Sequence, residues 1–565
     1  MWFKQLIRSL TAGVLIFPVA SWSSDSSVKA FEQPQVYEWL DQGWTDQERA
    51  RWHYLSAGQA FAPVTWLMAL ERVGTNQQLT DQKFLESMGF LYDKKNLENP
   101  MHLPIGFAVG KEELFAKGMV GFSCAACHTT QIKYGKKAVR IDGGVSMIDL
   151  PVFFQQYRAS LLETYSTPDK WKKFSATVRR DSKQTDDTLR DEVQQVLTAN
   201  KWASQELVEV AKGSIAGGPG RMDALNGIGN LIFGLSLKTG TNFHTTAAPA
   251  STPFLWDIWR FDWMHYNSSF SQPMAQNVLQ VLGANGFTNF VDAEGQSNPA
   301  PSRWNSSVDI KALESTDVAF RKLLSPQWPS DLLGPYDTLK ASRGEKLFDA
   351  HCASCHGAKP NPNPLDKKFQ LSVTNIPIDV IGTDPVYAQK FAIQTFDISK
   401  ISNEKNRVSG STALSYVTEM VKNRAYDLLN YTPEERAISN GFGRSNVMQG
   451  ELVYRARTLH GVWSSAPYLH NGSVPNIYEL LSPVSERSSK FWVGSFEYDP
   501  EKLGFVHTKI EGGFLFDTSI QGNGNQGHEF SNKTGAGVIG RLLTHDERLE
   551  IIEYLKSMKR LPNSN

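Results

Sequence analysis

Two short segments of the chain place cysteine and histidine at a spacing that can attach a haem. The first reads Cys-Ala-Ala-Cys-His at 124–128, and the second reads Cys-Ala-Ser-Cys-His at 352–356. Each cysteine of such a motif can add to a haem vinyl group, and the adjacent imidazole can then ligate the iron. The residues predicted to hold haem are Cys124, Cys127, His128, Cys352, Cys355 and His356.

Two other chemistries use paired cysteines, and both fit this sequence less well. A zinc site could use both pairs, but it would not need a histidine after each, and the pairs lie far apart in the chain. A redox dithiol is expected once, at the start of a helix in a βαβ unit. The chain has 4 cysteines and all belong to the two motifs. We therefore predict two covalently bound c-type haems.

Composition and the N-terminal residues indicate an exported protein that does not bind nucleic acid. Lysine plus arginine total 58, as do aspartate plus glutamate, so no net positive charge attracts a polyanion. Lys4 and Arg8 precede an apolar run at 10–20 and then small residues, a pattern typical of a signal peptide over 1–23. The run is too short to span a membrane. We expect a mature chain without a membrane span, in the periplasm or secreted; an N-terminal helix that stays attached as a membrane anchor is the alternative.

Helices are the elements expected to position the motifs. Ser342 and Glu345 have the spacing of a capping box that opens a helix leading to the second motif, and Thr544 and Glu547 repeat it near the C-terminus. Other helices are expected at 48–72, 149–164, 186–213 and 432–440, and no run of alternating strands is found. The predicted fold is mainly α, with two cytochrome c-like haem domains, long loops and little β structure. The domains are expected at 27–325 and 335–565.

The other axial ligands decide what the haems can do, because a six-coordinate haem carries electrons while an open one can bind oxygen or peroxide. His470 lies in "APYLHNGSVPN", where prolines and an Asn-Gly pair fix a turn that could present an imidazole. His460, ten residues earlier, is its rival, and an ordinary turn histidine is the alternative to both. The loops "KPNPNPLDKK" and "IQGNGNQGHEFSNKTGAG" show no recognisable chemistry.

Several longer segments resemble one family. They are "NPMHLPIGFAVG", "VGFSCAACHTTQ", "GPGRMDALNGIGN", "PFLWDIWRFDWMHYNSSF", "APYLHNGSVPNIYELL" and "FWVGSFEYDPEKLGF". Together they resemble the di-haem c-type cytochromes related to rubber oxygenase RoxA, a group near the bacterial di-haem cytochrome c peroxidases and MauG. The resemblance covers most of the mature chain.

The resemblance implies a division of labour between the two haems. It implies that His470 is the distal ligand of the C-terminal haem, which would then be bis-histidine with His356. The haem held by His128 would keep its distal position open or weakly filled, and substrate chemistry would take place there.

The aromatic segment 253–270 is expected to form the distal wall and the bridge between the haems. The resemblance supports Trp256 as an aromatic residue between the haems and Phe270 as an apolar lid over the first iron. Packing in the core is the ordinary alternative for both. The same segment also supplies His265 and Tyr266, either of which could enter the pocket as a ligand or an acid.

Arg221 and Asp223 are candidates for further contacts with cofactors. The guanidinium of Arg221 is suited to a haem propionate or to a contact between the domains, with a surface salt bridge as the alternative. Calcium lies between the haem domains in related peroxidases, and Asp223 or Asn226 could supply oxygen ligands for it. The sequence contains no ordered calcium-binding loop.

Three classes of function remain open at this point. The favoured class is an oxidoreductase in which dioxygen attacks a hydrophobic substrate, such as a polyene, at the first haem. The second is a peroxidase that takes electrons from a small donor protein and needs an acid–base group, such as His265, to split hydrogen peroxide. The third is an electron carrier without a substrate.

Overall fold

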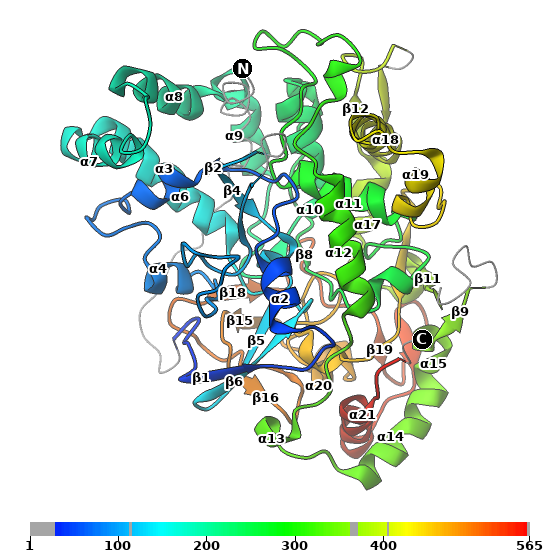
Figure 1. Cartoon of the computed structure of the whole chain (residues 1–565). Helices are drawn as coiled ribbons and strands as arrows, with labels where there is room; N and C mark the ends of the chain where they lie inside the picture. The colour runs from blue at the N-terminus through cyan, green and yellow to red at the C-terminus, as the bar shows by residue number, and fades with distance from the viewer. Residues whose placement is uncertain (1–28, 112–115, 362–370, 404–405, 562–565) are drawn as a thin grey trace.

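The computed structural model describes residues 29–111, 116–361, 371–403 and 406–561 (Figure 1). The predicted signal peptide at 1–23 lies outside these residues. The described chain is mainly helical, as predicted, and its strands are short and form small two- and three-stranded sheets. No helix within the described ranges is long and apolar enough to cross a membrane.

Two three-stranded sheets position the first haem motif. They have the orders β1-β6-β5 and β2-β4-β3. Strand β4 leads into the short helix α5 (Cys124–Cys127), and β5 starts directly after His128. The strands are β1 (Val36–Trp39), β2 (Ala62–Pro63), β3 (Phe107–Val109), β4 (Met119–Phe122), β5 (Thr129–Tyr134) and β6 (Lys137–Asp142).

The remaining strands form pairs only. The strand β11 pairs with β14 in antiparallel fashion, and β14 ends directly before Arg457. These strands are β7 (Arg221–Met222), β8 (Ala250–Ser251), β9 (Lys359–Pro360), β10 (Leu371–Ser372), β11 (Thr374–Pro377), β12 (Thr395–Asp397), β13 (Arg407–Ser409), β14 (Val453–Ala456), β15 (Lys490–Val493), β16 (Tyr498–Asp499), β17 (Gly504–Phe505), β18 (Phe514–Asp517), β19 (Glu529–Phe530) and β20 (Val538–Gly540).

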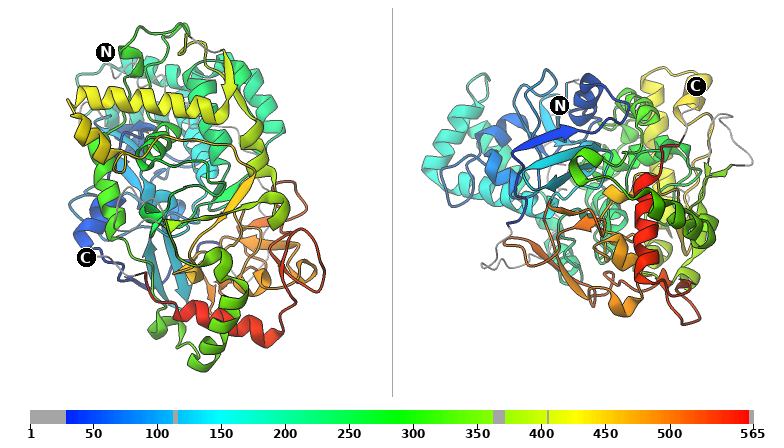
Figure 2. Two further views of the ribbon diagram at one scale, coloured as in Figure 1. Left: turned by 90° about the vertical axis from the view of Figure 1, so that its right-hand side faces the viewer. Right: turned by 90° about the horizontal axis from the view of Figure 1, so that it is seen from below.

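Helices surround the sheets on several sides, as the three views in Figures 1 and 2 show. The helices before the second motif are α2 (Asp46–His53), α3 (Val64–Ala69), α4 (Gln82–Glu86), α6 (Leu150–Ser166), α7 (Pro168–Val178), α8 (Asp186–Thr198), α9 (Ser204–Lys212), α10 (Ala224–Gly229), α11 (Pro273–Gly283), α12 (Ile310–Lys322) and α13 (Ser330–Leu333). The later helices are α14 (Thr338–His351), α15 (Ala353–His356), α16 (Ile378–Ile381), α17 (Val386–Ile393), α18 (Gly410–Leu428), α19 (Pro433–Ser439), α20 (Ile477–Leu480) and α21 (His545–Ser557).

The predicted helices at 149–164 and 432–440 are confirmed as α6 and α19, but two others are interrupted. The expected helix at 48–72 is instead α2 and α3. Between them Gly58 adopts φ of 106°, and an added Cβ there would lie 1.8 Å from the Ser307 carbonyl oxygen. The expected helix at 186–213 is split into α8 and α9 by a turn and a short 3₁₀ helix at Lys201–Ala203.

Helices α14 and α21 cross beside the second motif (Figure 1). The capping box at Thr544 is confirmed, because its side chain accepts from the Glu547 amide and Glu547 accepts from the Thr544 amide. The one predicted at Ser342 is wrong: α14 already starts at Thr338, and its N-cap is Asp337. The crossing is close at Gly344, where an added Cβ would lie 1.9 Å from the Glu550 carbonyl oxygen.

One hydrophobic cluster contains residues from both sides of the predicted domain boundary. It includes Trp52 and Trp256 from the first part and Phe348, Trp463 and Ile552 from the second. Single hydrogen bonds also connect the two parts, as where the Lys133 amide donates to the Phe496 carbonyl at 2.7 Å. The boundaries of the two haem domains therefore stay a prediction, while the described residues on both sides share a core.

The substitution Gly344→Ala tests the crossing of α14 and α21. Alanine normally stabilises a helix interior relative to glycine by up to ~1 kcal/mol, but here its Cβ would meet backbone. We expect the free energy of unfolding to fall by ~1–3 kcal/mol, as for an overpacked core. Urea unfolding followed by circular dichroism measures it. The exposed Ser342→Ala in the same helix is the matched control, and equal stability of both variants would contradict the close crossing.

Candidate haem sites

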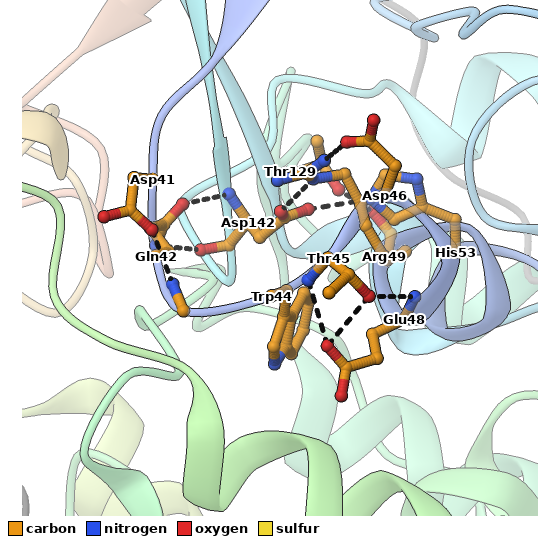
Figure 3. A network of polar contacts seen from close by, with 12 residues as sticks. Asp41, Gln42, Trp44, Thr45, Asp46, Glu48, Arg49, His53, Thr129 and Asp142 are labelled. Carbon is orange, nitrogen blue, oxygen red and sulfur yellow. Dashed lines mark hydrogen bonds and ion pairs between the residues drawn. The ribbon is translucent and has the colours of Figure 1, made fainter.

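The first haem motif is held on both sides by a buried polar network (Figure 3). Asp142 accepts from His53 Nε2 and from Arg49 Nε, each at 2.8 Å, and the side chains of Asp142 and His53 are fully buried. Before the motif, Ser123 Oγ donates to the His53 carbonyl at 2.8 Å. After it, Thr129 pairs with Asp142 across the β5–β6 hairpin. The network fixes the backbone that carries Cys124, Cys127 and His128.

The residue His128 is partly buried, with its Nδ1 atom shielded from solvent, and is suited to ligate a metal. Burial lowers its pKa to about 4, so that the imidazole is neutral at physiological pH, and neutral imidazole is the form that binds iron. Its Nδ1 is buried and makes no hydrogen bond of standard geometry. The backbone of Pro253 nevertheless lies close enough to His128 to raise its pKa, which partly offsets the effect of burial. Pro253 therefore stands beside the ring, in the position of a group that orients a metal-binding histidine.

The second motif is nearer the surface. None of the residues of α15 is buried, whereas Ala125 and Ala126 of α5 are. His356 donates from Nδ1 to the Arg457 carbonyl at 2.8 Å, because a carbonyl oxygen can only accept. This hydrogen bond fixes the tautomer and leaves Nε2 as the nitrogen available to the iron. Burial lowers the pKa of His356 as well.

The ring of His528 faces the ring of His356. The two ring centroids are 6.3 Å apart and the planes are inclined by 63°. Nδ1 of His528 is buried without a hydrogen-bond partner, and burial lowers the pKa of this residue to about 3, with His356 as the next cause. The backbone of His528 adopts φ of 44°, a conformation that is uncommon outside glycine and clusters at functional sites.

His528 comes from the glycine- and asparagine-rich loop in which the sequence shows no recognisable chemistry. Long-range contacts hold this loop in place. Asp384 Oδ2 accepts from the Gly522 and Gly524 amides at 3.1 and 3.0 Å. Arg487 donates to the His528 carbonyl at 2.9 Å. A histidine beside a run of glycines was the only trace of this residue in the sequence.

The predicted ligand His470 is buried, but its ring contacts are with tyrosines. Its ring stacks on Tyr454, with centroids 4.1 Å apart and planes inclined by 21°. Burial lowers its pKa to about 3. The loop of His470 also supports the loop of His528, because Asn471 Nδ2 donates to the Gly524 carbonyl at 2.9 Å. The structure thus brings His528, and not His470, into ring contact with His356, and the role of His470 as a ligand stays a prediction.

The aromatic segment 253–270 lies between elements of both sites. Trp256 is fully buried, its ring stacks on Phe254 with centroids 4.4 Å apart, and its indole N–H donates to the His460 carbonyl at 2.7 Å. The side chain of His460, the rival ligand, lines a pocket of about 420 Å³ between α14 and α21. The predicted bridging role of Trp256 remains a prediction, but its neighbour Phe254 contacts Arg457, whose carbonyl accepts the hydrogen bond from His356.

Phe270 and His265 pack against each other. Their ring centroids are 4.4 Å apart, and Phe270 is fully buried. His265 Nε2 is 3.4 Å from Gln280 Nε2, and burial lowers its pKa to about 3. A neutral His265 next to an apolar ring fits a pocket wall, so the predicted roles of both residues stay predictions.

A carboxyl group that the sequence did not single out lies near the first motif. Asp317 accepts from Asn277 Nδ2 at 2.9 Å, and its charge influences the thiol of Cys124. Burial raises the pKa of Asp317 to about 7. An acid that titrates near neutral pH is a candidate for proton transfer.

Arg221 and Asp223 have mainly structural partners. Arg221 donates to Asn523 Oδ1 at 2.6 Å and stacks on Phe516, which joins it to the second part of the chain. Both oxygens of Asp223 accept hydrogen bonds, from the Asn226 amide, the Asn226 side chain and the Ala248 amide. No group of three His, Cys, Asp or Glu side chains in the described residues could hold a metal ion. Calcium therefore stays a prediction.

Comparison with known proteins identifies the class. The family described as "Cytochrome c" matches residues 341–437, which include the second motif, and the family described as "RoxA-like, cytochrome c-like" matches residues 453–493. The uncharacterized protein y4iJ of Sinorhizobium fredii is 34% identical over 595 residues, covering 97% of each chain. The uncharacterized protein y4iM of the same organism is 31% identical over 250 residues, covering 40% of this chain and 50% of that protein.

The motif, the hydrogen bond that orients its histidine and these matches define a c-type cytochrome with covalently bound haem. More narrowly, the chain belongs to the RoxA-related c-type cytochromes.

The substitution Asp142→Asn tests the network beneath the first motif. It removes the charge that pairs with buried Arg49 and His53, and breaking a buried ion pair costs ~3–5 kcal/mol. We expect the free energy of unfolding in urea to fall by that amount. Asp46→Asn is the control, because Asp46 pairs with Arg49 from a fully exposed position and should contribute nothing measurable. Equal effects of the two variants would contradict the structural role of Asp142.

Proposed function

We propose that this chain is an exported di-haem oxidoreductase that reacts with dioxygen at the haem of the first motif, and that it acts on a hydrophobic substrate. The observation that carries the proposal is the asymmetry between the two proximal histidines. His356 has the ring of His528 opposite it, whereas no aromatic or histidine ring of the described residues is in ring contact with His128. This difference supports a closed second haem and an open first haem.

The distance between His356 and His528 supports axial ligation of one iron by both. A bond from a metal to an imidazole nitrogen is roughly 2 Å long, and the ring centre lies roughly another ångström beyond, so two axial rings have centroids roughly 6 Å apart. The observed 6.3 Å agrees with this value. Burial keeps both imidazoles neutral, which is the form that ligates iron.

The first haem, once bound, supplies the iron at which dioxygen is bound and activated. The chain's own residues prepare this place. Burial keeps His128 neutral, and the Asp142 network fixes the backbone on either side of the motif. Trp256 is fully buried and stacks on Phe254, which directly follows Pro253, so an apolar ring pair lies next to the chain beside His128, and this favours a hydrophobic substrate and the exclusion of water.

A location outside the cytoplasm suits this chemistry. The predicted signal peptide and the two covalent haem motifs support a periplasmic or secreted protein.

Reaction with hydrogen peroxide is the second candidate, and Asp317 favours it. Its carboxyl group titrates near neutral pH and lies near the first motif, so it can take a proton from peroxide and return it to the leaving oxygen. A peroxidase would take its electrons from a small donor protein. The second haem motif is the more exposed one, which suits it to receive them.

The variants His528→Ala and His470→Ala test which histidine closes the second haem. Removing an axial ligand turns a low-spin haem high-spin. We expect His528→Ala to give a high-spin signal in EPR and optical spectra of the oxidised protein, while His470→Ala leaves the second haem low-spin. The opposite result would restore His470 as the ligand. Low-spin spectra in both variants would contradict ligation by either residue.

The variant Asp317→Asn separates the two candidate reactions. If peroxide is the substrate, loss of the acid–base group should lower the rate of its reaction by ~10²–10⁴-fold. The wild-type rate should also rise as pH increases through about 7, where the carboxyl group becomes a base, and the variant should lose this step. The exposed Asp331→Asn is the control.

An oxygenase gives a different pattern in the same measurements. Oxygen uptake with a hydrophobic polyene should then continue in Asp317→Asn, and peroxide should react slowly in both proteins. A wild-type protein that is inert to dioxygen, peroxide and carbon monoxide would contradict both enzymes and leave an electron carrier.

A further inference from the structure

Arg457 contacts elements of both haem sites. Its carbonyl accepts the hydrogen bond from His356 Nδ1 at 2.8 Å. Its side chain donates from Nη2 to the Phe254 carbonyl at 2.9 Å, and the guanidinium carbon lies 3.3 Å from the centroid of the Phe254 ring. Phe254 follows Pro253, whose backbone lies beside His128. One residue therefore connects the proximal side of the second motif with that of the first.

The positive charge of Arg457 has no carboxylate partner. The residue forms no ion pair with the residues that the structure describes, and its Nη1 is buried without a hydrogen-bond partner. Burial lowers its pKa well below the usual value, and the neighbouring charge of Arg455 acts in the same direction. The charges of Asp257 and Tyr266 raise the pKa of Arg457, but neither residue forms a salt bridge with it. A buried guanidinium nitrogen without a partner is costly, so this position is suited to an anion that accepts from Nη1.

The charge is also felt at the first motif. Arg457 is a cause of the lowered pKa of His128, after burial and against the backbone of Pro253. The Phe254 ring that the guanidinium covers is itself stacked on Trp256, so the guanidinium is held by a packed aromatic ring and by a main-chain carbonyl. This fixed position distinguishes Arg457 from a flexible surface arginine.

We propose that Arg457 binds a propionate carboxylate of the first haem and couples the two haem sites. The proposal rests on the two-haem function proposed above. A guanidinium pairs with a carboxylate through two parallel N–H bonds, which would satisfy Nη1 and neutralise the buried charge. The positive charge also favours the reduced form of a nearby iron, because an added electron is attracted to it. Through its carbonyl the same residue orients His356, so the positions of both haems depend on it.

The variants Arg457→Gln and Arg457→Lys test this role. Midpoint potentials come from a spectroelectrochemical titration, and the propionate bending band comes from resonance Raman spectra. In Arg457→Gln we expect the reduction equilibrium constant of the first haem to fall at least tenfold, which is ~59 mV for one electron. Arg457→Lys keeps the positive charge, so most of the midpoint potential of the first haem should remain. It loses the paired N–H groups that would bind the propionate, so the propionate Raman band should shift in this variant as well as in Arg457→Gln.

Arg436→Gln is the matched control for the change in charge. Arg436 also lies over an aromatic ring, that of Tyr426, and donates to a carbonyl, that of Tyr431, but it has a carboxylate partner in Asp427. Its potentials and Raman band should equal those of the wild type. The low-spin spectrum of the second haem should persist in every variant, because the hydrogen bond to His356 comes from the main chain.

An unchanged potential and an unchanged propionate band in Arg457→Gln would overturn the proposal. If Arg457→Gln does not fold, the propionate Raman band of Arg457→Lys is the test, and an unshifted band overturns the proposal. None of these results contradicts the proposed function. The proposed function is contradicted if no haem of the wild-type protein binds carbon monoxide, and this binding is measured before any variant is made.

Discussion

In the proposed di-haem protein, the arrangement of both haem sites depends on the stacking of Arg457 on Phe254. This contact joins residues 203 positions apart in the chain. On one side the carbonyl of Arg457 fixes the tautomer of His356, and on the other side Pro253 lies beside His128. Strand β14, which carries the chain to Arg457, is held by its pairing with β11.

The two motifs have the same residues but different surroundings. The first is enclosed, with buried alanines in α5 and a fully buried Asp142–His53 pair beneath it. The second lies in a helix without buried residues, and its histidine faces another histidine. The enclosed motif is suited to chemistry that excludes water, and the other is suited to exchange electrons at the surface. The proposed division of work therefore rests on the local environment of each motif and not on the motif itself.

The sequence was sufficient for features that depend on neighbouring residues. The spacing of each Cys-x-x-Cys-His motif, the capping box at Thr544 and the helix at Leu150–Ser166 are of this kind. The sequence did not predict features that depend on backbone groups from distant parts of the chain. The chain at Gly58 leaves the helical path because it packs against the Ser307 carbonyl, and α14 starts before Ser342 because Asp337 caps it. His528 was missed because its loop is ordered by Asp384 and Arg487.

Titration of the fully reduced wild-type protein with carbon monoxide tests the central claim most directly. Carbon monoxide binds ferrous haem only where an axial position is open or weakly held. With haem content determined independently, the account predicts one carbon monoxide bound for every two haems, with the second haem remaining low-spin. Binding at both haems, or at neither, would contradict the division into an open and a closed site.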